Sequence, residues 1–215
     1  MGIHSPDWPH YHYYHTFNML LDSLIRPGRR VLELGCGTGD SALHLALSVD
    51  EILALDFSQQ MIHKAGSKLK AFPNKTKVHL AISDAQYIPA RDATFDGIFS
   101  RGALLNYVPN PTKVLAEICR VLVPSGKLIL DMITRKPGGE AKLYPPTQVE
   151  TMLKDAGFFE ITFRPIGMFV NLWRNRELMD FANKHRDIFC RIEIEMNDTF
   201  RLDRSPMMLL TARKK

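Results

Sequence analysis

The sequence contains no long uncharged hydrophobic run, and this absence argues against a membrane-spanning helix. The basic-then-apolar pattern of a secretory signal is also missing, because Asp22 interrupts the apolar run from Met19 to Ile25. The myristoylation pattern that can follow Gly2 fails as well, since Pro6 occupies its serine or threonine position. These absences predict a cytoplasmic protein with no membrane anchor.

Cysteine is scarce, and Cys36, Cys119 and Cys190 are widely separated. They show no metal-ligand spacing and cannot form an even set of disulfides, so a reducing compartment is expected. The histidines at positions 10, 12 and 15 have no carboxylate or cysteine beside them at ligand spacing. No metal site is therefore predicted.

The chain of 215 residues is long enough for one domain with a substantial core, and we expect a single domain over residues 1–215. Its 45% hydrophobic and 24% charged residues are ordinary for a globular protein. The net charge of +5 permits an acidic partner such as nucleic acid but does not require one. A monomer or a homodimer is expected.

Residues 31–42 are the most informative stretch of the chain. An apolar run is followed by Gly35, Gly37 and Gly39 and then by an amphipathic segment. This pattern predicts a buried strand over 31–34, a tight turn, and a helix over 41–48. Glycines permit positive φ and close approach of a ligand to the backbone. Both are needed at the end of the first strand of a doubly wound α/β sheet, where nucleotide-like ligands bind.

The charges around this loop narrow the ligand. A dinucleotide fingerprint needs glycine at the position of Asp40, near the helix N-terminus where a pyrophosphate would lie. Asp40, together with Glu33 two residues before the first glycine, repels phosphate and attracts an ammonium group. S-adenosylmethionine has an adenosine end and a cationic amino-acid end, so it fits the loop better than NAD. A glycine-rich turn without a ligand is the alternative.

Residues 33–39, Glu-Leu-Gly-Cys-Gly-Thr-Gly, resemble the first motif of the class I S-adenosylmethionine-dependent methyltransferases. The resemblance covers roughly residues 27–165 and more weakly 206–214, and it is nearest to the small-molecule branch that includes quinone-biosynthesis C-methyltransferases. It implies a Rossmann-like, doubly wound sheet that is mostly parallel with an antiparallel last strand. It also implies helices on both faces and an N-terminal helical lid.

A second predicted strand, over residues 51–58, contains the acid Asp56 at its polar end. A carboxylate at that place can accept hydrogen bonds from both ribose hydroxyls, although a simple helix-capping carboxylate is the alternative. Phe57 can pack on the adenine. Ser58 is expected to cap a helix that contains Met61.

Predicted strands over 77–82 and 94–100 complete this half of the sheet. The first leads to Asp84 and Ala85, a pair that meets the adenine edge in the resembling family. The second ends where the transferring methyl group lies in that fold. The residues expected to bind the cofactor are Glu33, Gly35, Cys36, Gly37, Gly39, Asp40, Asp56, Phe57, Met61, Asp84, Ala85, Ser100 and Arg101.

The remaining chain is assigned by the same patterns. We expect helices over 16–25, 112–122, 146–157 and 171–187, and strands over 127–132, 158–166, 190–196 and 207–212. Within the single domain, we expect an N-terminal lid helix (1–26), a cofactor-binding core (27–166), an insertion shaping a substrate pocket or dimer face (167–205), and a last strand with a basic tail (206–215). The aromatic and histidine-rich residues 8–15 can cover the cofactor with their rings or simply pack on the sheet. In the insertion, the candidate pocket residues are Met168, Phe169, Trp173 and Phe181, for which core packing is the alternative.

The end of the fourth strand bears on the substrate. Residues 100–103 lack the Asn/Asp-Pro-Pro-aromatic loop typical of methylation of amino groups in DNA or of protein amides, and no cysteine nucleophile lies there. A small-molecule acceptor is the leading hypothesis, followed by RNA and then by a non-catalytic cofactor-binding subunit. The family's paired His-His or His-Trp is Asn106-Tyr107 here. Candidate bases are His10, His12, His15 and Tyr107, of which His15 and Tyr107 are our catalytic assignments.

Overall fold

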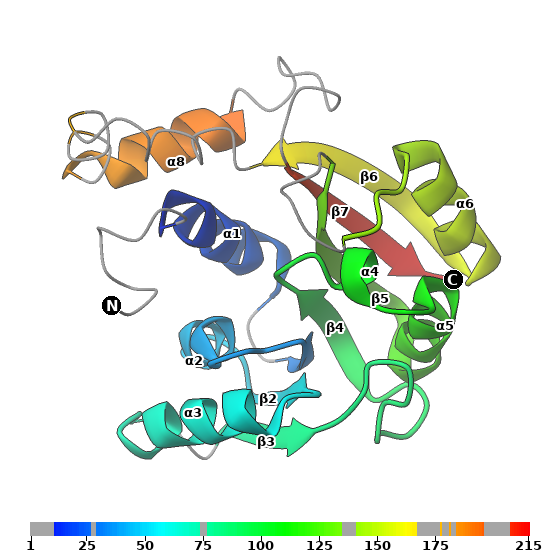
Figure 1. The fold of residues 1–215 in the computed structure, drawn as a ribbon, viewed down its shortest axis with the longest axis horizontal. Coiled ribbons are helices and arrows are strands. Elements are labelled where there is room, and N and C mark those ends of the chain that lie inside the picture. The colour runs from blue at the N-terminus through cyan, green and yellow to red at the C-terminus, as the bar shows by residue number, and fades with distance from the viewer. Residues whose placement is uncertain are drawn as a thin grey trace.

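The computed structural model describes residues 11–26, 29–73, 77–134, 141–166, 177, 181, 184–195 and 207–215. Figure 1 shows the described residues as an α/β fold around one twisted sheet. The helices are α1 (Tyr11–Leu24), α2 (Asp40–Leu45), α3 (Gln59–Lys70), α4 (Leu104–Tyr107), α5 (Pro111–Val121), α6 (Pro146–Asp155) and α8 (Arg186–Glu195). The strands are β1 (Arg30–Leu34), β2 (Glu51–Asp56), β3 (Val78–Ile82), β4 (Phe95–Ser100), β5 (Leu122–Ile133), β6 (Phe158–Ile166) and β7 (Met207–Lys214).

In the described part of the chain, seven strands pair in the order β3-β2-β1-β4-β5-β7-β6. The first five are parallel, and β7 runs antiparallel to both β5 and β6. The chain moves outward from β1 to β3 and then returns to place β4 on the other side of β1. The topological switch point therefore lies between β1 and β4. The predicted Rossmann-like sheet with an antiparallel last strand is confirmed.

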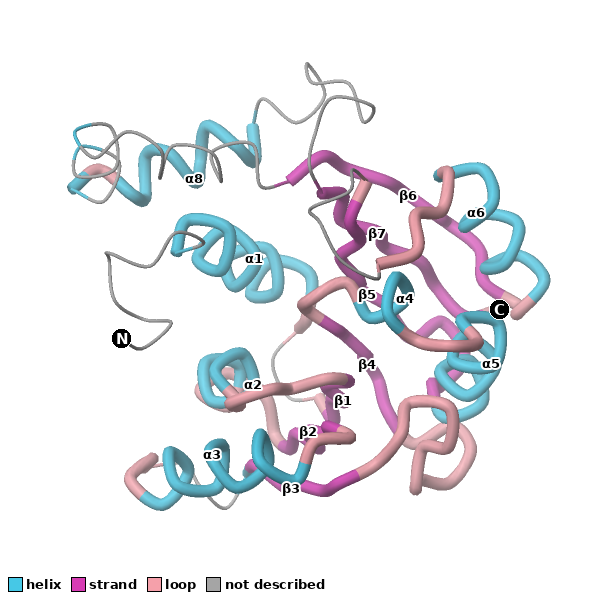
Figure 2. The backbone as a smooth tube through the Cα atoms, in the orientation of Figure 1, coloured by secondary structure: helices cyan, strands magenta, loops and turns pink. Residues whose placement is uncertain are grey.

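Helices cover both faces of the sheet, as Figure 2 shows. Alternation along β1 sends Leu32 and Leu34 into a core that contains residues of α5 and α6. Val31 points to the other face and packs in a second core with residues of α1 and α2. Glu33 lies two residues after Val31, so it is directed to the same helix-covered face. This position explains why a charged residue in a strand is 1% exposed.

Most predicted elements lie close to their expected bounds. The predicted strand 158–166 coincides with β6, whereas α2 ends at Leu45, before the predicted end at residue 48. The predicted cap is also confirmed, because the Ser58 hydroxyl accepts a hydrogen bond from the Met61 amide at 3.4 Å at the start of α3.

The prediction of a strand over residues 190–196 is wrong, because residues 186–195 form α8. Apolar residues alternate along this short segment, but Cys190 and Ile194 are four apart and share one helix face. Cys190 is 1% exposed, and Ile194 packs against the core that contains α1. Burial against α1 thus favours the period of a helix over that of a strand. Most of the predicted helix 171–187 lies outside the described residues. The candidate pocket residues Met168, Phe169 and Trp173 lie outside them as well, and the fourth candidate, Phe181, has a side chain that is 54% exposed.

Helix α1 packs on the sheet through an apolar stripe at helical spacing. Phe17, Leu20 and Leu21, together with Ile25 just after the helix, are all buried in the core that contains α2. The predicted helix 16–25 is confirmed and begins earlier, at Tyr11. Within the described ranges, no helix is both long and apolar enough to cross a membrane.

Candidate functional site

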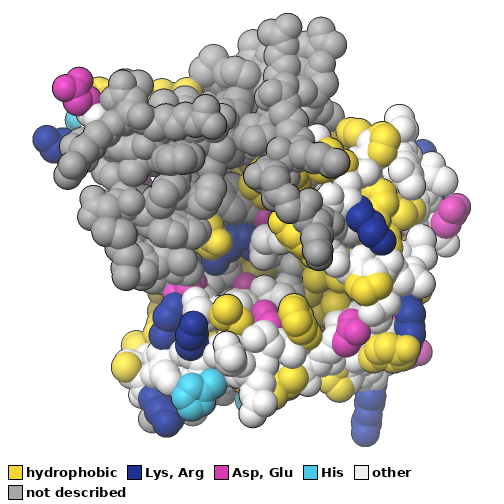
Figure 3. Space-filling view, in the orientation of Figure 1, with side chains coloured by type: hydrophobic (Ala, Val, Ile, Leu, Met, Phe, Trp, Pro, Cys, Tyr) yellow, Lys and Arg dark blue, Asp and Glu magenta, His cyan; other side chains and the backbone are white. Residues whose placement is uncertain are grey.

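A cavity of about 590 Å³ lies at the carboxyl ends of β1 to β4, beside the switch point. A pocket of this size suits a metabolite or cofactor. The face drawn in Figure 3 is hollowed near its centre, where charged side chains of both signs are visible. The residues that line the cavity are Leu34, Gly35, Leu55, Asp56, Phe57, Ser83, Asp84, Ala85, Ser100, Arg101, Gly102, Leu104, Tyr107, Val108 and Pro109.

The glycine loop after β1 has the backbone conformation that its sequence predicts. Gly35, Gly37 and Gly39 have φ values of +68°, +53° and +78°, a region that side chains disfavour. A Cβ atom on Gly39 would also lie 3.2 Å from the Cβ atom of Ala65 in α3. Gly35 lines the cavity, so a ligand there meets backbone rather than a side chain.

Asp56 connects the glycine loop to the start of α3. Its Oδ2 atom accepts a hydrogen bond from the Gly37 amide at 2.8 Å, and its Oδ1 atom accepts one from the Ser58 amide at 2.8 Å. The Ser58 contact is an Asx-type turn just before α3, whose N-cap is Ser58 rather than Asp56. Each oxygen keeps a further lone pair, and Asp56 lines the cavity, so the carboxylate can still accept hydrogen bonds from a ligand.

Glu33 and Arg101 are buried ionisable residues that interact near the loop. Glu33 Oε2 is the buried side-chain oxygen for which no hydrogen-bond partner is found among the described residues. Burial raises the pKa of Glu33 to about 8, while the nearby Arg101 opposes this shift. The Arg101 guanidinium lies 3.7 Å from the ring centroid of Tyr14 in α1. Its pKa is lowered by burial, although Tyr14 and Glu33 oppose this effect.

Asp40 is neutralised by a residue that the sequence did not indicate. Its Oδ1 atom lies 2.7 Å from Lys68 Nζ, and its Oδ2 atom accepts a 2.6 Å hydrogen bond from the Thr38 hydroxyl. Lys68 follows Asp40 by 28 residues and reaches it from α3, so no local pattern could have revealed the pair. Of these two acids, Glu33 rather than Asp40 lacks a direct ion pair among the described residues.

The other predicted cofactor residues divide into two groups. Phe57, Asp84 and Ala85 line the cavity, and Phe57 is 82% exposed, which leaves its ring free to pack on a ligand. Ser100 also lines it, but its hydroxyl donates to the Leu34 carbonyl at 2.7 Å and thereby joins β4 to β1. Cys36 and Met61 are absent from the lining, and Cys36 is buried with its pKa raised by burial.

The two catalytic assignments fall in different places. Tyr107 lines the cavity and is 57% exposed. His15 does not line it, and its Nε2 atom lies 3.1 Å from Asp187 Oδ1 in α8. The side chains of His10 and His12 lie outside the described residues.

Asn106, in the position of the family's first histidine, has a structural role. Its side-chain amide donates to the carbonyls of Ile133 and Lys142, and its oxygen accepts from the Ile133 amide. These bonds use both donors of a fully buried side chain, so Asn106 is committed to holding α4 against β5.

Asp131 in β5 shapes the loop after β4 and was missed by sequence reasoning. Its carboxylate accepts hydrogen bonds from the amides of Gly102 and Ala103 at 2.7 to 2.9 Å. Both residues have positive φ, so these bonds hold an otherwise unfavourable turn at the cavity wall. Burial raises the pKa of Asp131 to about 6. The sequence does contain a signal for Asp131, namely an acid inside an apolar strand, which is the pattern that identified Glu33.

The described residues fit a nucleoside that carries an amino acid. The loop offers unobstructed backbone at Gly35, Asp56 offers acceptors, and the cavity has the needed volume. The unpartnered Glu33 oxygen and the buried Arg101 guanidinium match an ammonium group and a carboxylate respectively. Among the described residues, no three His, Cys, Asp or Glu side chains gather in a way that could hold a metal ion.

Comparison with known proteins agrees with this geometry. Residues 31–126 match the family described as a methyltransferase domain. The chain is 28% identical over 181 residues to a demethylmenaquinone methyltransferase of Symbiobacterium thermophilum, covering 65% of this chain and 72% of that protein. With several other demethylmenaquinone methyltransferases the chain aligns over 41–45% of their length.

Solved structures share the fold. The cyclase SpnF superposes with a TM-score of 0.70 at 23% identity, covering 92% of this chain and 79% of SpnF. Phosphoethanolamine N-methyltransferase 2 of Haemonchus contortus, solved with S-adenosylhomocysteine, superposes with a TM-score of 0.68 at 19% identity. The superposition covers 94% of this chain and 52% of that protein. Residues 31–126 therefore match a methyltransferase domain, and the fold around them is shared with solved methyltransferase structures.

Proposed function

We propose that this protein transfers the methyl group of S-adenosylmethionine to a small-molecule acceptor by in-line displacement. The observation that carries this proposal is the juxtaposition at one cavity of the side-chain-free Gly35, the acceptor oxygens of Asp56 and the guanidinium of Arg101, with the buried Glu33 close to Arg101 behind the cavity lining. The cofactor supplies a methyl group already activated by a sulfonium. The similarity to demethylmenaquinone methyltransferases supports a small-molecule acceptor.

In this proposal each end of the cofactor has its own residues. Asp56 accepts from the ribose hydroxyls, and Asp84 with Ala85 meets the adenine edge beside the exposed ring of Phe57. Glu33 and Arg101 hold the ammonium and carboxylate of the amino-acid end. Gly37, Gly39 and Asp40 shape the loop, while Cys36 and Met61 support it from outside the cavity.

Positioning is the main task left to the protein, because the methyl group needs no further activation. Holding an acceptor at attack distance with water excluded contributes roughly 7–11 kcal/mol. Tyr107 is the better placed of our two catalytic assignments, since His15 is held by Asp187 away from the cavity lining. A base is needed only for a protonated amine, a phenol or a carbon acid.

The division of the chain is part of the same proposal. In it, residues 1–26 act as a lid over the cofactor, with Tyr14 of α1 reaching Arg101 at the cavity, and residues 167–205 shape the acceptor pocket or a dimer face. We also place the protein in the cytoplasm as a monomer or a homodimer.

An RNA acceptor is in keeping with the net charge of +5. A non-catalytic cofactor-binding subunit is the third possibility, because no described histidine lines the cavity.

The test uses S-adenosylmethionine labelled in its methyl group, incubated with the protein and a cell extract that is then separated into metabolites, RNA and protein. We expect label in the metabolite fraction, reduced with Asp56→Asn and kept with Asp50→Asn, an exposed control. Ribonuclease-sensitive label would establish the RNA alternative. Cofactor binding by calorimetry with no transfer into any fraction would establish the non-catalytic one.

A further inference from the structure

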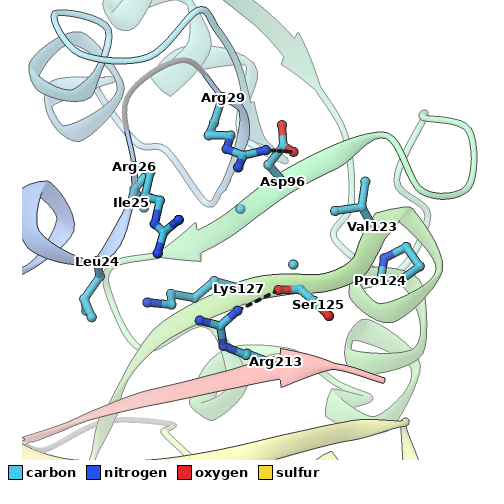
Figure 4. A pocket seen from close by; sticks show the side chains of 12 residues that line it. Leu24, Ile25, Arg26, Arg29, Asp96, Val123, Pro124, Ser125, Lys127 and Arg213 are labelled. Atoms are coloured by element: carbon cyan, nitrogen blue, oxygen red, sulfur yellow. Dashed lines mark hydrogen bonds and ion pairs between the residues drawn. The ribbon is translucent and has the colours of Figure 1, made fainter.

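A second cavity, of about 270 Å³, lies at the opposite edge of the sheet. It is bordered by the residues after α1, the amino ends of β1 and β4, and the carboxyl end of β7. Because β7 is antiparallel, its last residues meet the amino ends of the parallel strands. Gly97, Lys127 and Arg213 are in register across β4, β5 and β7. Figure 4 shows this cavity from close by.

An irregularity in β5 opens the cavity. Leu122 pairs with Phe95 and Lys127 pairs with Gly97, so residues 123–126 bulge from the sheet opposite Asp96. Gly97 contributes no side chain, so space is left beside Lys127, its partner in β5. The apolar part of the wall comes from Leu24, Ile25, Val123 and Pro124.

Four cationic side chains line this small space, namely Arg26, Arg29, Lys127 and Arg213. They come from three segments of the chain, and in Figure 4 the side chains of Arg26, Lys127 and Arg213 point toward one another. Such convergence of cations beside apolar walls creates a strong positive potential.

Carboxylates compensate only two of these cations. Arg29 Nη1 lies 3.0 Å from Asp96, and Arg213 Nε lies 3.0 Å from Glu160. Arg26 and Lys127 form no ion pair with any carboxylate among the described residues.

Two of these cations, Lys127 and Arg213, repel each other. Lys127 and Arg213 are directly opposite in the ladder, and like charges in that relation destabilise a sheet. Burial lowers the pKa of Lys127, Arg213 and Arg26 lower it further, and Glu160 opposes them. A bound anion would relieve this repulsion.

We infer that this cavity is a second ligand site, which binds a dianionic phosphate group through Arg26, Lys127 and Arg213. Guanidinium and ammonium groups donate charge-assisted hydrogen bonds to phosphate oxygens. The volume is below the roughly 300–1,000 Å³ of pockets for whole organic ligands, so one phosphate group fits better than a nucleotide. Free inorganic phosphate and the terminal phosphate of a metabolite share this chemistry. The site is independent of the proposed methyl transfer.

The test measures binding of inorganic phosphate and of glycerol phosphate to the full chain by calorimetry, at constant ionic strength against chloride. We expect saturable binding that Lys127→Met and Arg26→Gln each weaken about tenfold or more. The tighter of the two ligands identifies whether the group is free or esterified. Lys70→Met, which removes an exposed charge on α3, should bind as the unchanged protein does.

Thermal unfolding separates loss of the site from loss of the fold. Without phosphate, Lys127→Met should unfold at the same or a higher temperature, because it removes a like-charge contact. It should also lose the rise in unfolding temperature that phosphate gives the unchanged protein. The inference is overturned if phosphate acts no differently from chloride or if Lys70→Met loses binding equally. The inference would also be overturned if the protein binds RNA, if Lys127→Met weakens that binding, and if phosphate does not displace the RNA.

Discussion

Replacing Glu33 with glutamine should abolish a proton release that accompanies cofactor binding. Burial raises the pKa of Glu33 from 4.5 to about 8 in the protein without ligand. At pH 7 the carboxyl group is therefore about nine-tenths protonated. An ammonium group placed beside it favours the ionised form, so binding should release about 0.9 proton at that pH.

The sign and size of the pH effect follow from this linkage. The free protein binds the proton and the complex does not, so cofactor affinity rises with pH below 8. With a pKa of about 8 in the free protein, the affinity should rise about thirtyfold between pH 5.5 and pH 7. Glu33→Gln cannot lose a proton, and its affinity should vary far less across this range.

Titration calorimetry in two buffers of different ionisation enthalpy measures the released proton directly. Glu195→Gln, an exposed change on α8, serves as the control and should keep the proton release. The reasoning is refuted if the unchanged protein releases no proton, or if Glu33→Gln releases as much. In the absence of cofactor, Glu33→Gln should also stabilise the fold at pH 8, because burying the ionised carboxyl of Glu33 is costly at that pH. At pH 5 the carboxyl is protonated, so this stabilisation should disappear.

Three further changes test the loop and the cavity. Asp56→Ala removes charge-assisted hydrogen bonds to the ribose and should weaken cofactor binding by about 1.5–3 kcal/mol; unchanged affinity by calorimetry would remove Asp56 from the site. Gly39→Ala places a Cβ atom 3.2 Å from Ala65 at a φ of +78° and should lower the free energy of unfolding by about 1–2 kcal/mol, measured in urea. Lys68→Met removes the ion pair to the buried Asp40 carboxylate and should lower the free energy of unfolding by about 2–3 kcal/mol, after discounting for the partly exposed lysine. Equal stability of either variant and the unchanged protein would contradict these assignments.

Local patterns in the sequence were enough to predict most of the fold and much of the site. The alternating glycines predicted positive φ, and Gly35, Gly37 and Gly39 all adopt it. The acid at the end of β2 was assigned to the site, and Asp56 lies at the cavity. Such features depend on neighbours in the chain, and a strand, its turn and its helix are encoded within a dozen residues.

Long-range contacts were beyond those patterns. Asp40 and Glu33 looked equivalent as acids beside the loop, but Lys68 neutralises Asp40, while Glu33 is buried with its Oε2 atom unpartnered. Residues 190–196 alternate in sequence as a strand does, yet packing against α1 makes residues 190–195 helical.

The sequence by itself determined where most strands of the sheet lie in the chain and which turns and polar residues follow them, because these follow from local conformational preference and periodicity. Only the tertiary structure decided which charges are compensated, since this depends on side chains that meet from distant segments. The convergence of Arg26, Lys127 and Arg213 arises in this way, because the antiparallel β7 brings the C-terminal arginine to the edge where the parallel strands begin.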